Sequence, residues 1–305
     1  MFITCGNSEA NHKNWLKPLI QVGLNLLIYT LTDIMRTIIA IIICFVCCQS
    51  KDELRKLNYE EVLELIHNRS FNYNYASYLD EFENPLSDSL RQLLNQGKLA
   101  RDFYINKAGE IQQVRVRKLK EEDILNEIVI RGSISYIMTN KDQFTLREVD
   151  CDSIPELVNR VHTIDQGLRM GTIEGSIFET DKENRAIVLS IVKKCGWTAF
   201  HDSIVPKVFY VFQHMPDDYI AVSFPFFLKH ADKGVLPLKQ LALMEDRLRM
   251  NNAFPQKFGT QIVQQSFYQI EDPYNVNRRR AEYGLDSIEK VAESRGFVFD
   301  PEDHL

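Results

Sequence analysis

The stretch FYINKAGEIQQVRVR, residues 103–117, predicts a β-hairpin and decides that the fold contains sheet as well as helix. Its first residues are aromatic or branched, and Val114 and Val116 alternate with two arginines, which is the two-residue period of a strand with one buried face. Gly109 lies between the two halves, where a tight turn favours a residue without a side chain. The second half of this stretch is basic, and we interpret the arginines as the solvated face of the strand.

Helical spacing of apolar residues flanks this hairpin on both sides. Before it, short helices are expected after Asn58 and over 87–96, and after it we expect a helix over 121–130 and a strand near 133–138. Further helices are expected over 155–170, 180–192, 203–214, 218–232, 237–250 and 285–294, with a second short hairpin at 260–270. The sequence therefore predicts an α+β fold, mostly helical, with short β-hairpins near 103–117 and 260–270.

The composition excludes several classes of protein. Of 305 residues, 45% are hydrophobic, and 36 basic side chains face 42 acidic ones, for a net charge of −6. Disordered chains have lower hydrophobicity and higher net charge, so one or two buried cores are expected. A mildly acidic chain has no broad cationic field for a phosphate backbone, and we therefore expect no nucleic-acid partner.

Two apolar runs, 18–32 and 37–48, lie in the first fifty residues and are separated by Asp33 and Arg36. Neither run reaches the roughly eighteen apolar residues of a spanning helix. A helix through both would place the two charges near the bilayer centre, at about 2.5–3.5 kcal/mol each. Met35 and Arg36, followed by a short apolar run and a small-residue site, are instead typical of a secretory signal.

The end of that run, 45–50, resembles the lipobox of bacterial lipoproteins, in which the cysteine after the cut is lipidated; the resemblance implies lipidation at Cys48. On this interpretation 1–34 is an upstream extension or a misassigned start, and 35–48 is the signal. Residues 49–150 then form an α+β region and 151–305 a mainly helical domain. The alternative is an apolar membrane anchor or hairpin at the N-terminus. Both the lipidated signal and the apolar anchor predict that the residues after position 48 lie outside the cytoplasm or on a membrane surface.

Cysteine usage agrees with export. Four of the six cysteines lie before position 49, which leaves Cys151 and Cys195 in the body. Two cysteines permit one optional disulfide, but they cannot form a disulfide-dense scaffold or a CxxC metal site. The sequence predicts no metal site and no cofactor. The GxSxG, Walker, GxGxxG and HExxH motifs do not occur in it, so it lacks the familiar hydrolase, nucleotide and zinc-protease patterns.

A set of motifs over residues 155–290 resembles a family of bacterial proteins catalogued as a domain of unknown function, family 6624. The motifs are Asp165-Gln166-x-x-Arg169, Gly196-Trp197, Gln213-His214, Asp246-Arg247, Gln256-x-Phe258-Gly259-Thr260-Gln261 and Ile270-Glu271-Asp272-Pro273-x-Asn275-Val276-x-x-Arg279-Arg280-x-x-x-Gly284-Leu285. The most specific blocks are the one around Thr260 and the one from Asp272 to Arg280. The resemblance implies no activity and no catalytic residue.

Polar residues among apolar neighbours are the candidate site. Asp165 and Arg169 lie four apart on one helix face, and His214 ends an apolar helix. These three are the catalytic candidates, with the histidine as general base and the arginine binding an anion. The binding candidates are Gln166, Asp246, Arg247, Gln261 and Arg279, and His201-Asp202 is a weaker second pair. The alternative is a surface ion pair, a satisfied histidine and a structural network of buried polar groups.

Two functions of different classes remain. The first, which we favour, is an exported, lipid-anchored envelope protein that binds an unknown protein or small molecule, in which the aromatic segment 71–82 is one possible contact surface. The second is an envelope hydrolase or transferase that acts on an anionic substrate through His214, Asp165 and Arg169. Mutual pairing of these side chains in a closed interior favours the binding protein, and their convergence in an open pocket favours the enzyme.

Overall fold

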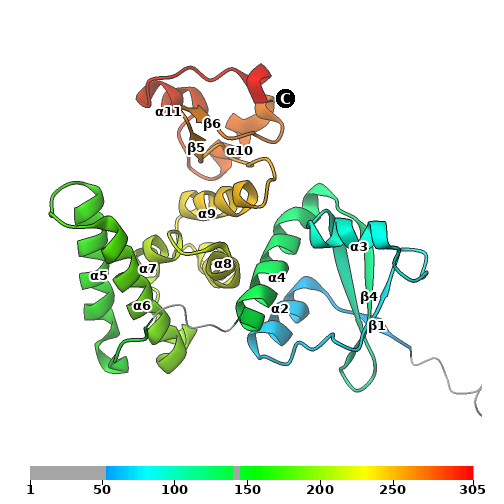
Figure 1. Ribbon diagram of the computed structural model, residues 1–305. Helices are drawn as coiled ribbons and strands as arrows, with labels where there is room; N and C mark the ends of the chain where they lie inside the picture. The colour runs from blue at the N-terminus through cyan, green and yellow to red at the C-terminus, as the bar shows by residue number, and fades with distance from the viewer. Residues whose placement is uncertain (1–52, 140–144, 305) are drawn as a thin grey trace, which may run out of the picture. The chain divides into compact units, whose positions relative to one another are not determined.

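The computed structural model describes residues 53–139 and 145–304 (Figure 1). The chain divides into two units, Met1–Leu54 and Arg55–Leu305, and all elements named below belong to the second. The predicted signal and Cys48 lie outside the described residues. Within 53–139 and 145–304, no helix is both long enough and apolar enough to cross a membrane.

The predicted α+β fold, mostly helical with two short hairpins, is confirmed. A four-stranded sheet forms first, in the order β1-β3-β4-β2, with β3 and β4 antiparallel and β2 parallel to β4. Phe103 lies opposite Val114 in the hairpin, and both side chains are buried. The strands are β1 (Arg55–Lys56), β2 (Ser77–Leu79), β3 (Leu99–Ile105) and β4 (Ile111–Lys118).

The turn of this hairpin is closed by side chain and backbone together. The side-chain oxygen of Asn106 accepts hydrogen bonds from the N–H groups of Ala108 and Glu110, at 2.9 and 3.0 Å. Gly109 adopts a φ of 83°, a conformation that costs a residue with a Cβ free energy. The glycine at this position is therefore what permits the predicted turn.

Three helices accompany the sheet: α2 (Tyr59–His67), α3 (Asp88–Asn95) and α4 (Glu121–Thr139). The strand expected near 133–138 was wrong, because these residues continue α4. Helix α4 packs along α8, and a Cβ placed on Gly132 would lie only 2.4 Å from the Cβ of Ala221. Close packing between the two helices thus outweighs the β-propensity of the local sequence.

The second half contains the helices α5 (Ile154–Arg169), α6 (Ile177–Cys195), α7 (Val205–Phe212), α8 (Asp217–Asp232) and α9 (Leu238–Asn251). Helix α6 begins earlier than the expected residue 180, because the hydroxyl of Ser176 caps it by accepting from the N–H of Glu179. Phe209 and Phe212 pack edge-on against Phe227 inside the bundle. One hydrophobic core extends from Leu57 to Phe254, so residues on both sides of position 150 contribute to it.

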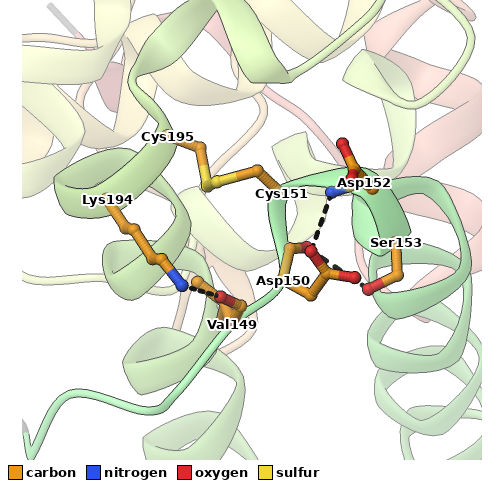
Figure 2. The surroundings of a disulfide bond; sticks show 7 residues. All are labelled: Val149, Asp150, Cys151, Asp152, Ser153, Lys194 and Cys195. Atoms are coloured by element: carbon orange, nitrogen blue, oxygen red, sulfur yellow. Dashed lines mark hydrogen bonds between the residues drawn. A yellow bond between two sulfur atoms is a disulfide. The ribbon is translucent and has the colours of Figure 1, made fainter.

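A disulfide joins Cys151, in the 3₁₀-helix η1 (Cys151–Ser153), to Cys195 at the end of α6 (Figure 2). The Cα atoms are 5.9 Å apart, within the usual range for a bridge. Beside it, the ammonium of Lys194 donates to the carbonyl of Val149 at 2.6 Å. The optional bridge that two body cysteines allow is therefore formed.

The chain ends in a small subassembly with its own core. It contains the second predicted hairpin, β5 (Ile262–Val263) with β6 (Ser266–Phe267), the helices α10 (Val276–Glu282) and α11 (Ile288–Ser294), and the 3₁₀-helices η3 (Pro273–Asn275) and η4 (Pro301–His304). Phe267, Ile270, Val276 and Ile288 are buried together in it. Gly259 approaches this core so closely that a Cβ there would lie 2.6 Å from the side chain of Ile288.

Candidate functional site

The predicted pair Asp165 and Arg169 is present at the C-terminal end of α5 and extends to the next helix. Asp165 is 2% exposed and accepts hydrogen bonds from the amide of Gln166 at 2.6 Å and from the guanidinium of Arg169 at 3.1 Å. The same guanidinium contacts Asp181 of α6 at 2.5 Å. A buried carboxylate needs a counter-charge and donors, and this arrangement supplies both.

His214 lies in the turn between α7 and α8, close to the arginines of the predicted set. Burial is the main cause that lowers the pKa of its imidazole to about 4, and the positive charges of Arg169 and Arg247 lower it further. The amide nitrogen of Gln213 lies 3.4 Å from Nε2 of the ring. An amide NH₂ group can only donate, so Nε2 accepts and carries no proton. His214 is therefore neutral at physiological pH.

Arg247 on α9 continues this network toward the C-terminal subassembly. Its guanidinium donates to the backbone carbonyl of Gln213 and to the side-chain oxygen of Gln261, the latter at 3.4 Å. Gln261 in turn donates to the carbonyl of Leu243 at 3.3 Å and to the hydroxyl of Thr260 at 2.9 Å. The structure thus links His214, through Gln213 and Arg247, to Gln261, and Arg169 acts on this group through the effect of its charge on His214.

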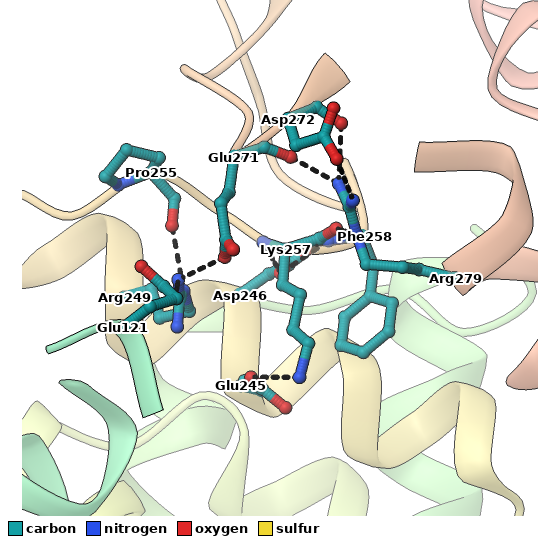
Figure 3. Close-up of polar contacts among 10 residues, drawn as sticks. All are labelled: Glu121, Glu245, Asp246, Arg249, Pro255, Lys257, Phe258, Glu271, Asp272 and Arg279. Atoms are coloured by element: carbon teal, nitrogen blue, oxygen red, sulfur yellow. Dashed lines mark hydrogen bonds and ion pairs between the residues drawn. The ribbon is translucent and has the colours of Figure 1, made fainter. Parts of the chain in front are cut away.

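Asp246, the neighbour of Arg247 on α9, holds a different part of the chain (Figure 3). Its fully buried carboxylate accepts from the backbone N–H groups of Lys257, Phe258 and Thr260 at 2.7, 3.0 and 2.9 Å, and from the Thr260 hydroxyl at 2.9 Å. Burial raises the pKa of Asp246, whereas these hydrogen bonds act in the opposite direction. This aspartate fastens the loop 257–260 to α9.

Arg279, the last predicted binding residue, fastens the same loop from its other side. It donates to the carbonyl of Lys257 at 2.8 Å, to the carbonyl of Asp272 at 3.0 Å and to the carbonyl of Glu271 (Figure 3). The neighbouring Arg280, 2% exposed, donates to the carbonyl of Phe258 at 2.6 Å. Arg279 and Asp246 therefore belong to one loop anchor, separate in its hydrogen bonds from the pairing around Asp165.

A third group, around Arg249, was missed by sequence reasoning. This guanidinium is 2% exposed and contacts Glu121 at the start of α4, the carboxyl of Glu271 at 2.7 Å, and the carbonyl of Pro255 at 2.8 Å (Figure 3). It lies in the wall of a pocket of about 470 Å³ that Glu245 also lines. Arg249 and Glu121 are 128 positions apart in sequence, so no local pattern connects them.

The two carboxyls on Arg249 have opposite pKa shifts. Burial, together with the hydrogen bond and the negative charge of Glu121, raises the pKa of Glu271 to about 7. Burial also acts to raise the pKa of Glu121, but hydrogen bonds from Glu271 and Arg249 outweigh it and leave that pKa lowered. Below about pH 7 the pair therefore holds one proton, a state that can serve as acid and base.

The weaker candidate pair His201-Asp202 lies in another pocket, where the carboxylate of Asp202 is 3.5 Å from Nε2 of His230. Among the described residues, no group of three or more His, Cys, Asp and Glu side chains is arranged to hold a metal ion.

No protein-family model, no curated protein and no solved structure matches the chain. The resemblance to family 6624 therefore stays a prediction.

Proposed function

We propose that the chain is an exported envelope protein, anchored to the membrane by lipid on Cys48, which acts as a binding module. The Cys151–Cys195 disulfide supports export, because such bonds persist in oxidising compartments and are rare in the cytosol. The order of Arg36, the apolar run and Cys48 supports a lipid anchor. An apolar N-terminal anchor without lipid is the alternative form of the same attachment.

One observation carries the binding role: the polar residues expected to do chemistry are paired with one another. Asp165 is bonded to Arg169 and Gln166, and Arg247 is bonded to Gln261 and a backbone carbonyl. The ring of His214 meets an amide rather than a hydroxyl or thiol. Such pairing stabilises the contact between helices and the C-terminal subassembly and leaves no activated nucleophile in this network.

The aromatic segment 71–82 supplies one surface for a protein partner. Phe71 packs against Phe103, with ring centroids 5.1 Å apart, whereas Tyr75 and Phe82 are 92% and 76% exposed. Protein interfaces are enriched in aromatic residues, and this segment holds one ring in the core and exposes two others. Double substitution of Tyr75 and Phe82 by serine should therefore weaken partner binding without lowering stability.

Mass spectrometry of the mature N-terminus tests the export proposal. We expect a chain that begins at a diacylated Cys48 and sediments with membranes. Cys48→Ser should abolish the lipid mass and release the protein, whereas the neighbouring Cys47→Ser is the matched control and should change neither. An uncleaved, unlipidated chain from both the parent and the control would contradict the lipid anchor.

A second candidate function, an envelope hydrolase or transferase for an anionic substrate, is favoured by the carboxyl pair on Arg249. With a pKa of about 7, Glu271 is available as a general acid, and the ionised Glu121 as a base. Arg249 and Lys257 are the positive groups of the same pocket, and glutamates of its lining pair with both: Glu121 and Glu271 with Arg249, and Glu245 with Lys257. An anionic substrate therefore has to displace these carboxylates to reach the two cations. These groups support the pocket of about 470 Å³, rather than His214, as the site of the enzyme alternative.

Chromogenic phosphate, sulfate and uronide substrates test this alternative. Glu271→Gln should abolish any turnover, because the amide cannot transfer a proton. Glu122→Gln is the matched control, since Glu122 lines the same pocket but has a side chain that is 76% exposed. Turnover that survives in Glu271→Gln, or none from the parent chain, would leave the binding module as the only proposal.

A further inference from the structure

A pocket of about 660 Å³ lies between the 3₁₀-helix η2 (Trp197–Ala199) and the C-terminal half of α8. Trp197, Phe200 and Phe226 line it with aromatic rings, and Lys229 and Lys233 line it with ammonium groups. Its volume is in the range of small-molecule sites, which combine apolar walls with a few polar groups.

The aromatic wall is held in one position by the fold. The Trp197 ring packs against Phe226 and Phe212, with centroids 5.1 and 5.3 Å apart. The backbone at Gly196 turns with a φ of 79°, and Cys195, just before it, is fixed by the disulfide. A preformed wall spares a ligand the entropic cost of ordering it.

A histidine in the lining is oriented as firmly as the rings. His230 is 8% exposed, and its Nδ1 donates to the carbonyl of Phe226 at 2.7 Å, because a carbonyl can only accept. The other ring nitrogen, Nε2, is 3.5 Å from the carboxylate of Asp202. The imidazole also packs against Phe226, with ring centroids 4.3 Å apart and the ring planes tilted by 47°. The pocket thus has one fixed polar group among its rings.

The lysines give the pocket its charge. Both Lys229 and Lys233 are exposed, and neither forms an ion pair with any residue in 53–139 or 145–304. Asp202 is the carboxylate in the lining, so the two ammonium groups outnumber it. The pocket therefore combines a rigid aromatic wall with an excess of positive charge.

We propose that this pocket binds a small planar aromatic carboxylate. The ring stacks on Trp197 and Phe226, as aromatic pairs prefer, and the carboxylate reaches Lys229 and Lys233 at the positively charged side. This assignment rests on the proposed binding function, for which it names the class of ligand. It requires neither lipidation at Cys48 nor a particular membrane.

The probe is 2-naphthoate, titrated by saturation-transfer NMR against the full chain in phosphatidylcholine nanodiscs, with empty nanodiscs as the blank. A ligand of this size should bind with a Kd of about 1 mM or tighter. Replacing Lys229 and Lys233 with glutamine should weaken binding about tenfold, the usual effect of removing two partly screened charges. The double substitution of Lys107 and Lys118, two exposed lysines of the β3–β4 hairpin, is the matched control and should leave Kd unchanged.

Three results would overturn the assignment. These are equal affinity for uncharged 2-naphthalenemethanol, equal affinity for the non-aromatic cyclohexanecarboxylate, and no saturation transfer from the parent chain at 10-fold the expected Kd (about 10 mM). Both lysines are exposed, so loss of fold is not a route to weaker binding, and a thermal melt of the variant confirms it. If the chain is unlipidated but binds 2-naphthoate, the pocket assignment stands and only the lipid anchor is refuted. If the chain is lipidated but fails to bind, the lipid anchor stands and the pocket assignment is refuted.

Discussion

His214→Gln should flatten the pH dependence of folding stability between pH 7 and pH 4.5. An imidazole with an ordinary pKa near 6.5 in the unfolded chain and about 4 in the folded protein binds its proton more readily when unfolded. The stability contributed by the neutral ring is therefore fully present above pH 6.5 and is lost as pH falls toward 4. Glutamine does not titrate, and its side-chain oxygen can still accept from Gln213.

The magnitude follows from the two pKa values. Between pH 7 and pH 4.5, linkage gives a loss of about 2 kcal/mol for a fully buried ring. His214 is only partly buried, and solvent screening reduces this to about 1 kcal/mol. Carboxylates that titrate in the same range are common to both proteins, so they cancel in the difference between variant and parent.

Urea unfolding at several pH values between 4.5 and 7.5 measures this difference. His201→Gln is the matched control, because that imidazole is exposed and its removal should leave the pH dependence parallel to that of the parent. Parallel curves for His214→Gln as well would show that His214 is not held neutral by burial and the two arginines, and would refute the electrostatic account of the polar network.

Three further changes test the rest of the structure. Arg249→Met should cost about 1–3 kcal/mol at pH 8, because it removes the counter-charge of two partly exposed carboxylates, and less at pH 5, where Glu271 is protonated; urea unfolding at both pH values measures it. Replacing Cys151 and Cys195 with serine should cost about 4 kcal/mol, as expected for a bridge across 44 positions, again measured by urea unfolding. Gly132→Leu should cost about 1–3 kcal/mol through overpacking against α8, measured by thermal melting and hydrogen exchange in α4.

Each change has a control and a contrary result. Arg295→Met is the control for Arg249→Met, because it removes an exposed guanidinium and should hardly change the free energy of unfolding. If Arg249→Met changes that free energy no more than Arg295→Met does, the pairing of Arg249 contributes little to stability. Reducing agent should destabilise the parent but not the double-serine variant, and insensitivity of the parent would contradict the bridge. Gly109→Leu is the control for Gly132→Leu. Gly109 has a positive φ and open space around it, so its substitution measures backbone strain without the overpacking expected at Gly132.

Local signals predicted the parts of this molecule that local interactions determine. The hairpin at 103–117 was predictable because its alternation and its turn glycine lie within fifteen residues, and the pairing of Asp165 with Arg169 because both lie on one helix face. The C-terminal half of α4 was not, because α8 decides its conformation from about ninety positions away. Helical patterns identify an apolar face but do not say which other element will cover it.

The candidate site shows the same division. The sequence singled out His214 and Arg247 as polar residues in apolar segments, and the structure brings them near one another. It gave no sign of Arg249 with Glu121, because an arginine near a helix end is ordinary until a distant carboxylate is folded against it. Trp197 was noted only within a motif, and its role in a pocket wall depends on rings from α7 and α8.

The disulfide also determines what a protease can release. Helices α5 and α6 and the exposed turn at 170–176 all lie between Cys151 and Cys195, so the bridge makes this hairpin of helices a closed covalent ring. Exposed turns of this kind are preferred sites of proteolytic cleavage. A cut there opens the ring without separating the fragments, and the nicked protein should run as one band on a gel until a reducing agent splits it into two. A protease can therefore cleave this chain in the 170–176 turn and still leave a single covalent molecule.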